Sequence, residues 1–280
     1  MKVIISHDVD HLTVWEHRRD MIVPKFVVRS LIELGLGFIS GREMRLRFQS
    51  IAANRWNRIE ELMGFDRQHG IPATFFVGMS NGKGLSYGRA LAGDWIRRIL
   101  GQGFSVGVHG VAYDDYSAMA EEHDGFKRAS GLPAFGVRMH YLRMAPGTHD
   151  LLGRIGYAFD STEPAMKGPY KIGGMWEFPL HVMDGRILSG GGRWQDRHLA
   201  AAQSETKSII ELASDAGLGY FTLLFHDRYF CESFKTWKEW YIWFVEYCEE
   251  NGLEFISYTG AIEEMVSRNG ENEDLVSFGL

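Results

Sequence analysis

Two carboxylates lie close together near the N-terminus, at the end of an apolar stretch over residues 3–9. The segment reads His7-Asp8-Val9-Asp10-His11. Alternate residues on a strand share one face, so Asp8 and Asp10 are expected to point the same way. Two carboxylates so placed can divide one reaction between them, because one can hold a divalent cation while the other takes a proton from water. This segment is the first candidate for an active site.

Further ionisable residues follow later apolar runs in the same way. They are His109, Arg138, His140, Tyr141, His226 and Asp227. In a parallel α/β barrel, the side chains just after the strands meet at one end of the barrel. Asp and His are usual zinc ligands, an Arg keeps a neighbouring Asp ionised, and a separate His can protonate a leaving group. The set therefore predicts metal-assisted hydrolysis of an amide or an ester.

Short apolar runs alternate with helical patterns along most of the chain, which predicts an α/β fold with parallel strands and crossover helices. Strands are expected at residues 3–9, 73–77, 104–108, 134–137, 176–179, 220–225 and 254–256. Helices are expected at 19–36, 55–69, 90–100, 115–129, 149–155, 199–216 and 235–251. The chain of 280 residues suits one barrel, which commonly has about 250 residues. We expect a single domain over residues 1–268 and a polar tail over 269–280.

The formal net charge of −6 argues against a nucleic-acid partner and favours a neutral or weakly charged small molecule or sugar. The two cysteines, Cys231 and Cys248, show no metal spacing and are expected to be reduced thiols. The N-terminal apolar run is too short for a signal peptide, and charged residues interrupt the apolar segment 22–39. These features predict a cytoplasmic protein that can still touch a membrane surface; the oligomeric state stays open.

Two stretches look like additions to the strand and helix pattern. Residues 35–54 carry Arg42, Arg45 and Arg47 among apolar residues, which fits either a basic patch for phosphate or anionic lipid, or a solvated helix face. Residues 185–197 are rich in glycine and contain Trp194, which predicts a mobile loop near the substrate. The indole of Trp194 is a candidate to stack on a sugar ring.

The order of these motifs resembles that of the polysaccharide deacetylases, carbohydrate esterase family four (the NodB homology domain). The resemblance covers residues 3 to about 258. It is carried by His7-Asp8-Val9-Asp10, Val106-Gly107-Val108-His109-Gly110, Arg138-Met139-His140-Tyr141, Phe159-Asp160-Ser161-Thr162, Glu177-Phe178-Pro179-Leu180 and Leu223-Leu224-Phe225-His226. No single motif is decisive, but their order and spacing together are fairly specific.

The resemblance implies a distorted, incomplete (β/α)7-type barrel and a role for each matching residue. Asp8 would be the general base, and Arg138 would orient it. Asp10 and His109 would be ligands of a divalent metal, with zinc as the expected ion. His226 would be the general acid. The implied activity is removal of an acetyl group from an N-acetylated sugar, and a cytoplasmic precursor of a surface polysaccharide, linked to a nucleotide or a lipid, is the expected substrate.

The sequence departs from the family pattern at Tyr113, which occupies the place of the second metal-binding histidine, four residues after His109. Asp114 or Tyr113 can supply the third ligand, His140 or His11 can substitute, or the site can lack a metal. We choose Asp114 as the expected ligand because carboxylates bind zinc and manganese, although an Asp there can equally cap the next helix.

Four residues are expected to bind the substrate: Tyr141, His140, His11 and Trp194. His7 alternates with Asp8 and is expected to be structural. Two other functions remain open. The chain can be a non-catalytic sugar-binding relative that has lost its metal, or a hydrolase of another carbon–nitrogen bond, as in the allantoinase-like relatives of the family.

Overall fold

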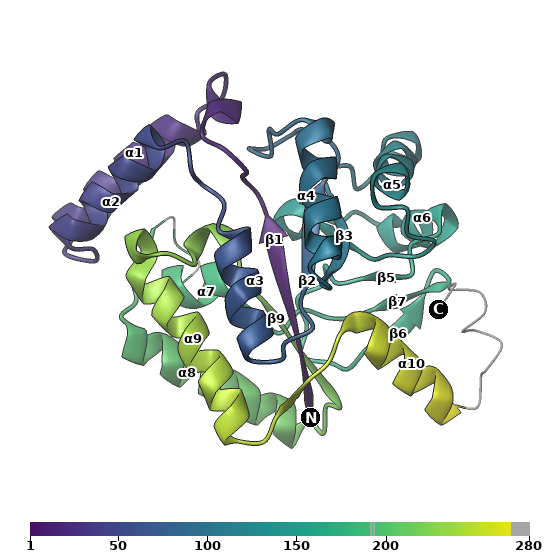
Figure 1. The fold of residues 1–280 in the computed structure, drawn as a ribbon. Coiled ribbons are helices and arrows are strands. Elements are labelled where there is room, and N and C mark those ends of the chain that lie inside the picture. The colour runs from purple at the N-terminus through teal and green to yellow at the C-terminus, as the bar shows by residue number, and fades with distance from the viewer. Residues whose placement is uncertain (191, 193, 270–280) are drawn as a thin grey trace.

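A curved mixed sheet forms the centre of the computed structural model, which describes residues 1–190, 192 and 194–269 (Figure 1). Within these residues the strand order is β6-β7-β5-β4-β3-β2-β1-β9-β8, and β10 pairs with β1. The strands are β1 (Lys2–Val9), β2 (Thr74–Gly78), β3 (Ser105–Gly110), β4 (Val137–Met139), β5 (Phe159–Asp160), β6 (Tyr170–Ile172), β7 (Met175–Glu177), β8 (Val182–Met183), β9 (Tyr220–Leu224) and β10 (Glu254–Phe255).

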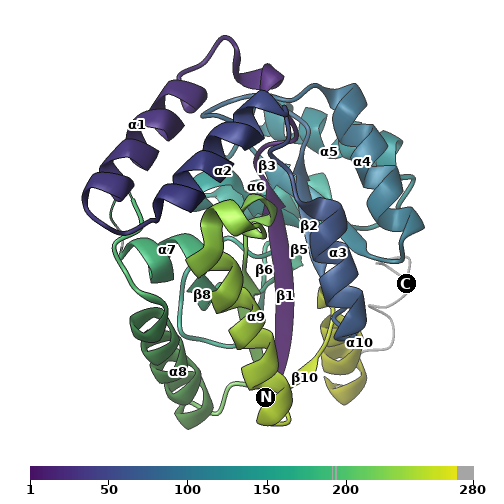
Figure 2. The ribbon, with the colours of Figure 1, turned by 60° about the vertical axis from the view of Figure 1, so that its left-hand side comes forward.

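Helices surround this sheet, and α3 and α9 lie on either side of β1 in Figure 2. The helices are α1 (Ile22–Gly35), α2 (Gly41–Ala52), α3 (Ile59–Gln68), α4 (Arg89–Gly101), α5 (Tyr116–Ser130), α6 (Thr148–Ile155), α7 (Asp184–Ser189), α8 (Leu199–Asp215), α9 (Lys235–Glu250) and α10 (Tyr258–Asn269). Short 3-10 turns occur at Trp15–His17, His140–Leu142, Asp227–Tyr229 and Glu232–Phe234. No helix in the described part of the chain is both long and apolar enough to span a bilayer.

The pairing of the strands brings the predicted site residues to one end of the sheet. β1 runs parallel to β2 on one side and to β9 on the other, and the parallel pairing continues through β3, β4, β5 and β7. Among the strands of the described residues, only β6 is antiparallel to its neighbour. The sheet's two outer strands, β6 and β8, do not pair with each other in the described residues, so the barrel stays open. The predicted α/β class and the incomplete barrel are confirmed.

Strand β1 separates two cores by the alternation of its side chains. Val3, Ile5 and Val9 belong to the large core between the sheet and its helices. Ile4 belongs to a second core on the opposite face, together with Phe76 and other aromatic residues. Because side chains alternate along a strand, Asp8 must share its face with Ile4 and point away from the helices. The strand pattern therefore determines which face carries the carboxylate.

His7 points to the other face, as expected for a structural residue. Its Nε2 lies 2.9 Å from Asp66 Oδ2, and its Nδ1 lies 2.9 Å from the carbonyl oxygen of Phe225. The hydroxyl of Tyr241 donates to the other oxygen of Asp66 at 2.7 Å. All these side chains are buried, so the polar groups satisfy one another within the core.

Most of the stretch over residues 35–54 belongs to a second helix, α2, which lies beside α1 (Figure 1). A capping box starts α2, because the Ser40 hydroxyl accepts from the Glu43 amide while the Glu43 carboxylate accepts from the Ser40 amide. Arg47 is only 1% exposed, whereas Arg42 and Arg45 are exposed. The predicted basic surface patch is therefore wrong for Arg47, because its helix turns that side chain inward.

Some elements were not predicted from the sequence. Part of the expected loop over 185–197 is helical, since α7 covers Asp184–Ser189, while residues 191 and 193 lie outside the described part. Strands β5 and β8 have two residues each, too few for an alternating pattern to be recognised. The predicted tail begins within α10, at Asn269, and its residues 270–280 lie outside the described part.

Candidate metal and catalytic site

A cavity of about 1090 Å³ opens at the carboxyl ends of the parallel strands. The chemically active residues that line it come from several elements: Asp8, Asp10, His109, His140, Tyr141, Trp194 and His226. Helix α1 contributes a further wall, which is largely apolar. A concave site with a few convergent polar groups is the usual form of a small-molecule site. The strand ends predicted from the sequence thus meet in one pocket.

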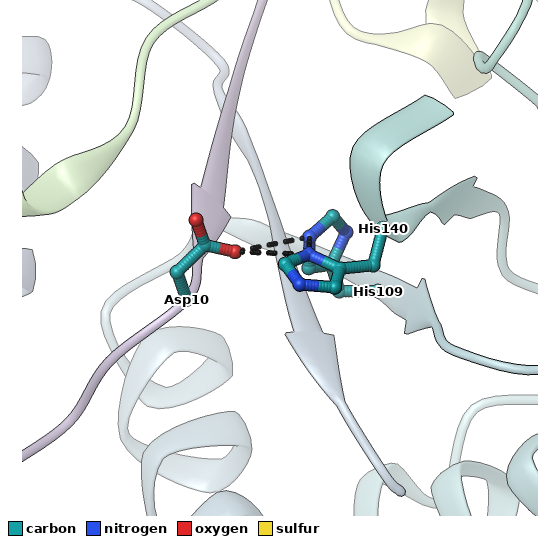
Figure 3. A group of neighbouring side chains, drawn as sticks. All are labelled: Asp10, His109 and His140. Atoms are coloured by element: carbon teal, nitrogen blue, oxygen red, sulfur yellow. Dashed lines mark hydrogen bonds and ion pairs between the residues drawn. The ribbon is translucent and has the colours of Figure 1, made fainter. Parts of the chain in front are cut away.

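Three ligand atoms converge at the bottom of this pocket (Figure 3). Asp10 Oδ1 lies 3.2 Å from His109 Nε2 and 3.3 Å from His140 Nδ1. The two histidine nitrogens lie 2.9 Å apart. Ligands at about 2.0–2.1 Å from a tetrahedral zinc ion stand roughly 3.3 Å from one another. The three atoms therefore have the spacing of one face of a zinc tetrahedron.

Backbone carbonyls hold both histidines in the tautomer that a metal requires. His109 Nδ1 lies 3.1 Å from the carbonyl oxygen of Arg138, and His140 Nε2 lies 3.4 Å from that of Lys83. A carbonyl only accepts, so these nitrogens carry the protons and the opposite ring nitrogens present lone pairs. Asp10 Oδ1 is buried and makes no hydrogen bond within the described residues. Two lone pairs and a carboxylate oxygen facing one another fit a divalent cation.

The charges around Asp10 favour its ionised form. Burial alone would raise its pKa, but the neighbouring imidazoles of His109, His140 and His226 hold the pKa well below its ordinary value. A carboxylate must be ionised to bind a metal. The residue is therefore in the protonation state that a ligand needs.

The turn after His140 has an unusual backbone. Tyr141 has φ 58° and Leu142 has φ 51°, and neither is glycine. Each residue in this left-handed region costs on the order of 1 kcal/mol or more, and such strain gathers at functional sites. The turn leaves Tyr141 66% exposed at the edge of the cavity while its neighbour His140 stays buried among the ligands.

Asp8 stands beside the metal ligands, next to a buried arginine. Arg138 Nη1 lies 3.3 Å from Asp8 Oδ1, and His109 Nδ1 lies 3.7 Å from Asp8 Oδ2. Burial lowers the pKa of Arg138, but Tyr258, Asp8 and Asp160 outweigh this and raise it, so the guanidinium stays charged. The guanidinium therefore lies within ion-pair distance of the Asp8 carboxylate.

Three residues that the sequence analysis did not assign hold Arg138 in place. The guanidinium donates to Ser6 Oγ at 2.8 Å, to Ser161 Oγ at 2.9 Å and to Tyr258 OH at 2.8 Å. Ser161 lies within the motif Phe159-Asp160-Ser161-Thr162, so the family resemblance could have identified it as a site residue. Ser6 and Tyr258 come from the two ends of the chain, and no sequence spacing connects them to Arg138.

His226 is held by a carboxylate that sequence reasoning also missed. Its Nδ1 lies 2.8 Å from Asp184 Oδ1, and its backbone amide donates to Asp184 Oδ2 at 2.7 Å. Its Nε2 lies 3.6 Å from Asp10 Oδ2. Burial lowers the pKa of His226, but Asp184, Asp10 and Asp8 hold it well above the ordinary value. The imidazole thus faces Asp10, and the surrounding carboxylates favour its charged form.

Substituting Asp184→Asn is expected to shift the pH dependence of activity. An acid catalyst works while it is protonated, so activity falls as the pH rises through the pKa of His226. Removing the Asp184 charge lowers that pKa, and the alkaline limb of the kcat profile should move to lower pH. The measurement is kcat against pH for both proteins. An alkaline limb at the same pH in the variant would show that His226 is not the acid.

The structure does not bring Asp114 into the metal group. Asp114 is exposed, and the cap of α5 is its neighbour Asp115, whose Oδ1 accepts from the Ala118 amide at 2.9 Å. The ring of Tyr113 lies against the Arg143 guanidinium, 4.8 Å away. The residue that the structure places beside Asp10 and His109 is instead His140, one of the alternatives to Asp114 that the sequence left open.

His11, predicted to bind substrate, lies in a second cluster with Glu16 and His17 and is not among the cavity-lining residues. Its Nδ1 lies 2.9 Å from His17 Nε2. Glu16 accepts from the amide of Leu12 at 2.8 Å and from that of Thr13 at 3.0 Å. Because the Glu16 carboxylate already accepts hydrogen bonds from two backbone amides of this loop, we assign the cluster a structural role.

A third cluster joins His149 to two buried carboxyl groups, Asp160 and Glu177. His149 Nε2 lies 3.4 Å from Glu177 Oε2 and 3.7 Å from Asp160 Oδ2. Burial raises the pKa of Glu177 to about 7, and burial and the charge of Glu177 raise that of Asp160 well above its ordinary value. Two carboxyl groups this close share a proton rather than both ionise.

This pair is expected to make the fold more stable at acid pH. The unfolded chain releases the proton near 4.5 and the folded chain near 7, so stability is full below 4.5 and declines as the pH rises to about 7. Substituting Glu177→Gln should flatten the loss of roughly 3 kcal/mol over this range. The free energy of unfolding at pH 5 and pH 8 tests this. The exposed Glu263→Gln is the control, and an unchanged slope in Glu177→Gln would contradict the shared proton.

The comparisons with known proteins bear on the fold. No family model and no curated protein matches the sequence. A protein assigned as a polysaccharide deacetylase from Mycobacterium smegmatis superposes with a TM-score of 0.65 at 16% identity, over 96% of this chain and 91% of the other. One from Pseudomonas aeruginosa PAO1 gives 0.58 at 13%, over 97% and 90%. The PuuE allantoinase gives 0.59 at 11%, over 95% and 89%. The chain has the fold of the polysaccharide deacetylases, as the motif resemblance predicted.

Proposed function

We propose that this protein is a metal-dependent hydrolase that removes the acetyl group from an N-acetylated sugar. The observation that carries the proposal is the convergence of Asp10, His109 and His140 in a pocket that also contains Asp8 and His226. The donor set of one carboxylate and two imidazoles suits zinc. A bound zinc ion would supply Lewis acidity toward the acetyl carbonyl.

The protein's own residues divide the proton transfers. Asp8 takes a proton from the attacking water, and Arg138 donates to Asp8 and orients it. His226 gives a proton to the departing nitrogen, and Asp184 keeps it charged and oriented. The base and the acid thus each have a separate partner of opposite charge.

The substrate class rests on the cavity and on the fold. Trp194 and Tyr141 line the cavity and offer aromatic faces to a sugar ring. Two of the superposed proteins are assigned as polysaccharide deacetylases. We place the substrate among the cytoplasmic precursors of surface polysaccharides, and we assign residues 1–268 to a single domain. Contact of the exposed apolar side chains Val28 and Leu31 of α1 with a membrane surface also belongs to this proposal.

Acetate release from N-acetylated sugars tests the activity. The protein is stripped with a chelator and then supplied with zinc, and acetate should appear only after the metal is added. The same panel should include a cyclic amide such as allantoin, because the PuuE allantoinase shares the fold. Turnover of the cyclic amide alone would replace the deacetylase with a hydrolase of another carbon–nitrogen bond. A protein that binds sugar but never retains zinc would be the non-catalytic relative.

A further inference from the structure

Three arginines gather where α1, α2 and the segment after β9 meet. They are Arg29, Arg47 and Arg228, and aromatic rings separate them. The Arg228 guanidinium lies 4.1 Å from the centre of the Trp56 ring and 4.4 Å from that of Phe26. The Arg47 guanidinium lies 4.3 Å from the centre of the Phe234 ring.

The positive charge of this arginine cluster exceeds the negative charge placed against it. Glu33 is the carboxylate that pairs with Arg29 and with Arg47 in the described part of the chain. In each of the three arginines the Nη2 nitrogen is buried and has no hydrogen-bond partner among the described residues. Three guanidinium groups and one carboxylate leave an excess of two positive charges. Buried charge without a partner is costly, so a site of this kind favours an anion.

The neighbouring carboxylate does not remove this excess. Asp227 precedes Arg228 in the chain, but its Oδ2 accepts from the Arg58 amide at 2.9 Å, and burial raises its pKa to about 7. Burial also lowers the pKa of Arg228 to about 10, and the charges of Arg29 and Arg47 act in the same direction. Arg228 thus remains a cation at neutral pH, but one whose surroundings disfavour its charge.

The arginine cluster borders the catalytic pocket. Arg228 follows His226 by two residues, and both line the cavity that contains Asp10. Arg29 and the exposed Lys25 line the same cavity from α1. A substrate whose acetyl group reaches the metal ligands therefore meets these cations with another part of its structure. The net charge of −6, which favoured a neutral substrate, averages over the surface and conceals this local excess.

We propose that Arg228, together with Arg29, forms an anion subsite that binds a phosphate or diphosphate group attached to the sugar substrate. The guanidinium fork matches phosphate oxygens, and a phosphate monoester brings about two negative charges to an excess of two positive ones. The inference rests on the proposed function only in naming a sugar. Nucleotide-linked and lipid-linked sugars share this chemistry, and the apolar wall of α1 is the feature by which they can differ.

Binding without turnover tests the subsite independently of activity. The probe is glucose 1-phosphate, which has no acetyl group, compared with methyl glucoside by titration calorimetry on the zinc-loaded protein. We expect the phosphate to bind more tightly, and Arg228→Met to weaken it roughly 10- to 100-fold while leaving methyl glucoside unchanged. Arg228→Lys keeps the charge and should retain part of the preference. Arg97→Met, at an exposed arginine of α4, is the matched control.

Two results would overturn the subsite. One is equal binding of glucose 1-phosphate to Arg228→Met and Arg97→Met, with both proteins folded by their near-UV circular dichroism. The other is a wild-type protein that binds the phosphate no better than the glucoside. If Arg228→Met does not fold, Arg228→Lys is compared with the wild type. Lysine keeps the positive charge but lacks the two-pronged guanidinium. An unchanged affinity for glucose 1-phosphate in Arg228→Lys would then contradict the assignment.

Turnover measurements then distinguish nucleotide-linked from lipid-linked sugars, and they test the subsite separately from the deacetylase activity. The substrates are methyl N-acetylglucosaminide, UDP-N-acetylglucosamine and N-acetylglucosamine linked to farnesyl diphosphate. A higher kcat/KM for both diphosphates, lost in Arg228→Met, supports the subsite, and a preference for the farnesyl compound assigns the apolar wall to a lipid. Acetate release from the uncharged glycoside at the same kcat/KM would refute the subsite and leave the deacetylase intact. Binding of the phosphate without acetate release from any of these compounds would support the subsite and contradict the deacetylase.

Discussion

Replacing His140 by alanine is expected to abolish both zinc retention and acetate release. His140 Nδ1 faces Asp10 Oδ1 and His109 Nε2 at ligand spacing, and two ligands are too few for a stable zinc site. Removal of a group that only hydrogen-bonds to a metal ligand costs about 10- to 100-fold in metal affinity, and loss of a ligand itself should cost more. Metal content after dialysis, measured by elemental analysis, is the readout, and acetate release is measured on the same samples.

The control for this experiment comes from the residues that sequence reasoning favoured. Asp114→Ala and Tyr113→Phe should retain zinc and activity, because Asp114 is exposed and Tyr113 packs its ring on Arg143. If Asp114→Ala lost its zinc and His140→Ala kept it, the ligand set drawn from the structure would be wrong. Loss in all three variants would point to disruption of the strand ends rather than to a ligand, and near-UV circular dichroism would show it.

Asp8→Asn should lower kcat by a factor of about 10² to 10⁴ while zinc remains bound. The amide keeps the size of the side chain but cannot take a proton from water, and general-base catalysis is typically worth this factor. KM should change little, since the role assigned to Asp8 lies in proton transfer and not in holding the sugar. Kinetics and metal content on one preparation check both parts.

The neighbouring arginine complicates this variant, so a second readout is needed. Asp8→Asn leaves Arg138 without its carboxylate, although Ser6, Ser161 and Tyr258 still accept from the guanidinium. The Tm should therefore fall, but zinc stoichiometry should not. A variant that retained full kcat would exclude Asp8 as the base, whereas simultaneous loss of kcat and zinc would make Asp8 a metal ligand instead.

Local patterns in the sequence were sufficient to predict which strand ends carry the candidate site residues. Strands end where apolar runs end, and parallel strands bring their carboxyl ends together, so the sequence alone predicts that Asp8, Asp10, His109, Arg138 and His226 gather at one end of the sheet. The alternation along β1 also separated Asp8 from His7. These inferences need only the period of a strand and the direction of its neighbours, and both are local properties of the chain.

Tertiary structure decided which residues complete the site. His140 lies beside Asp10 and His109, and two consecutive left-handed residues, Tyr141 and Leu142, follow it in a tight turn that no local propensity predicts. Asp184 reaches His226 across 42 residues, and Tyr258 reaches Arg138 across 120. Contacts between residues so far apart in the sequence depend on how the strands and helices pack together and not on local spacing. The carboxylates of the first strand thus indicated where the site lies, and the packing of strands distant in the sequence decided that His140 is their neighbour.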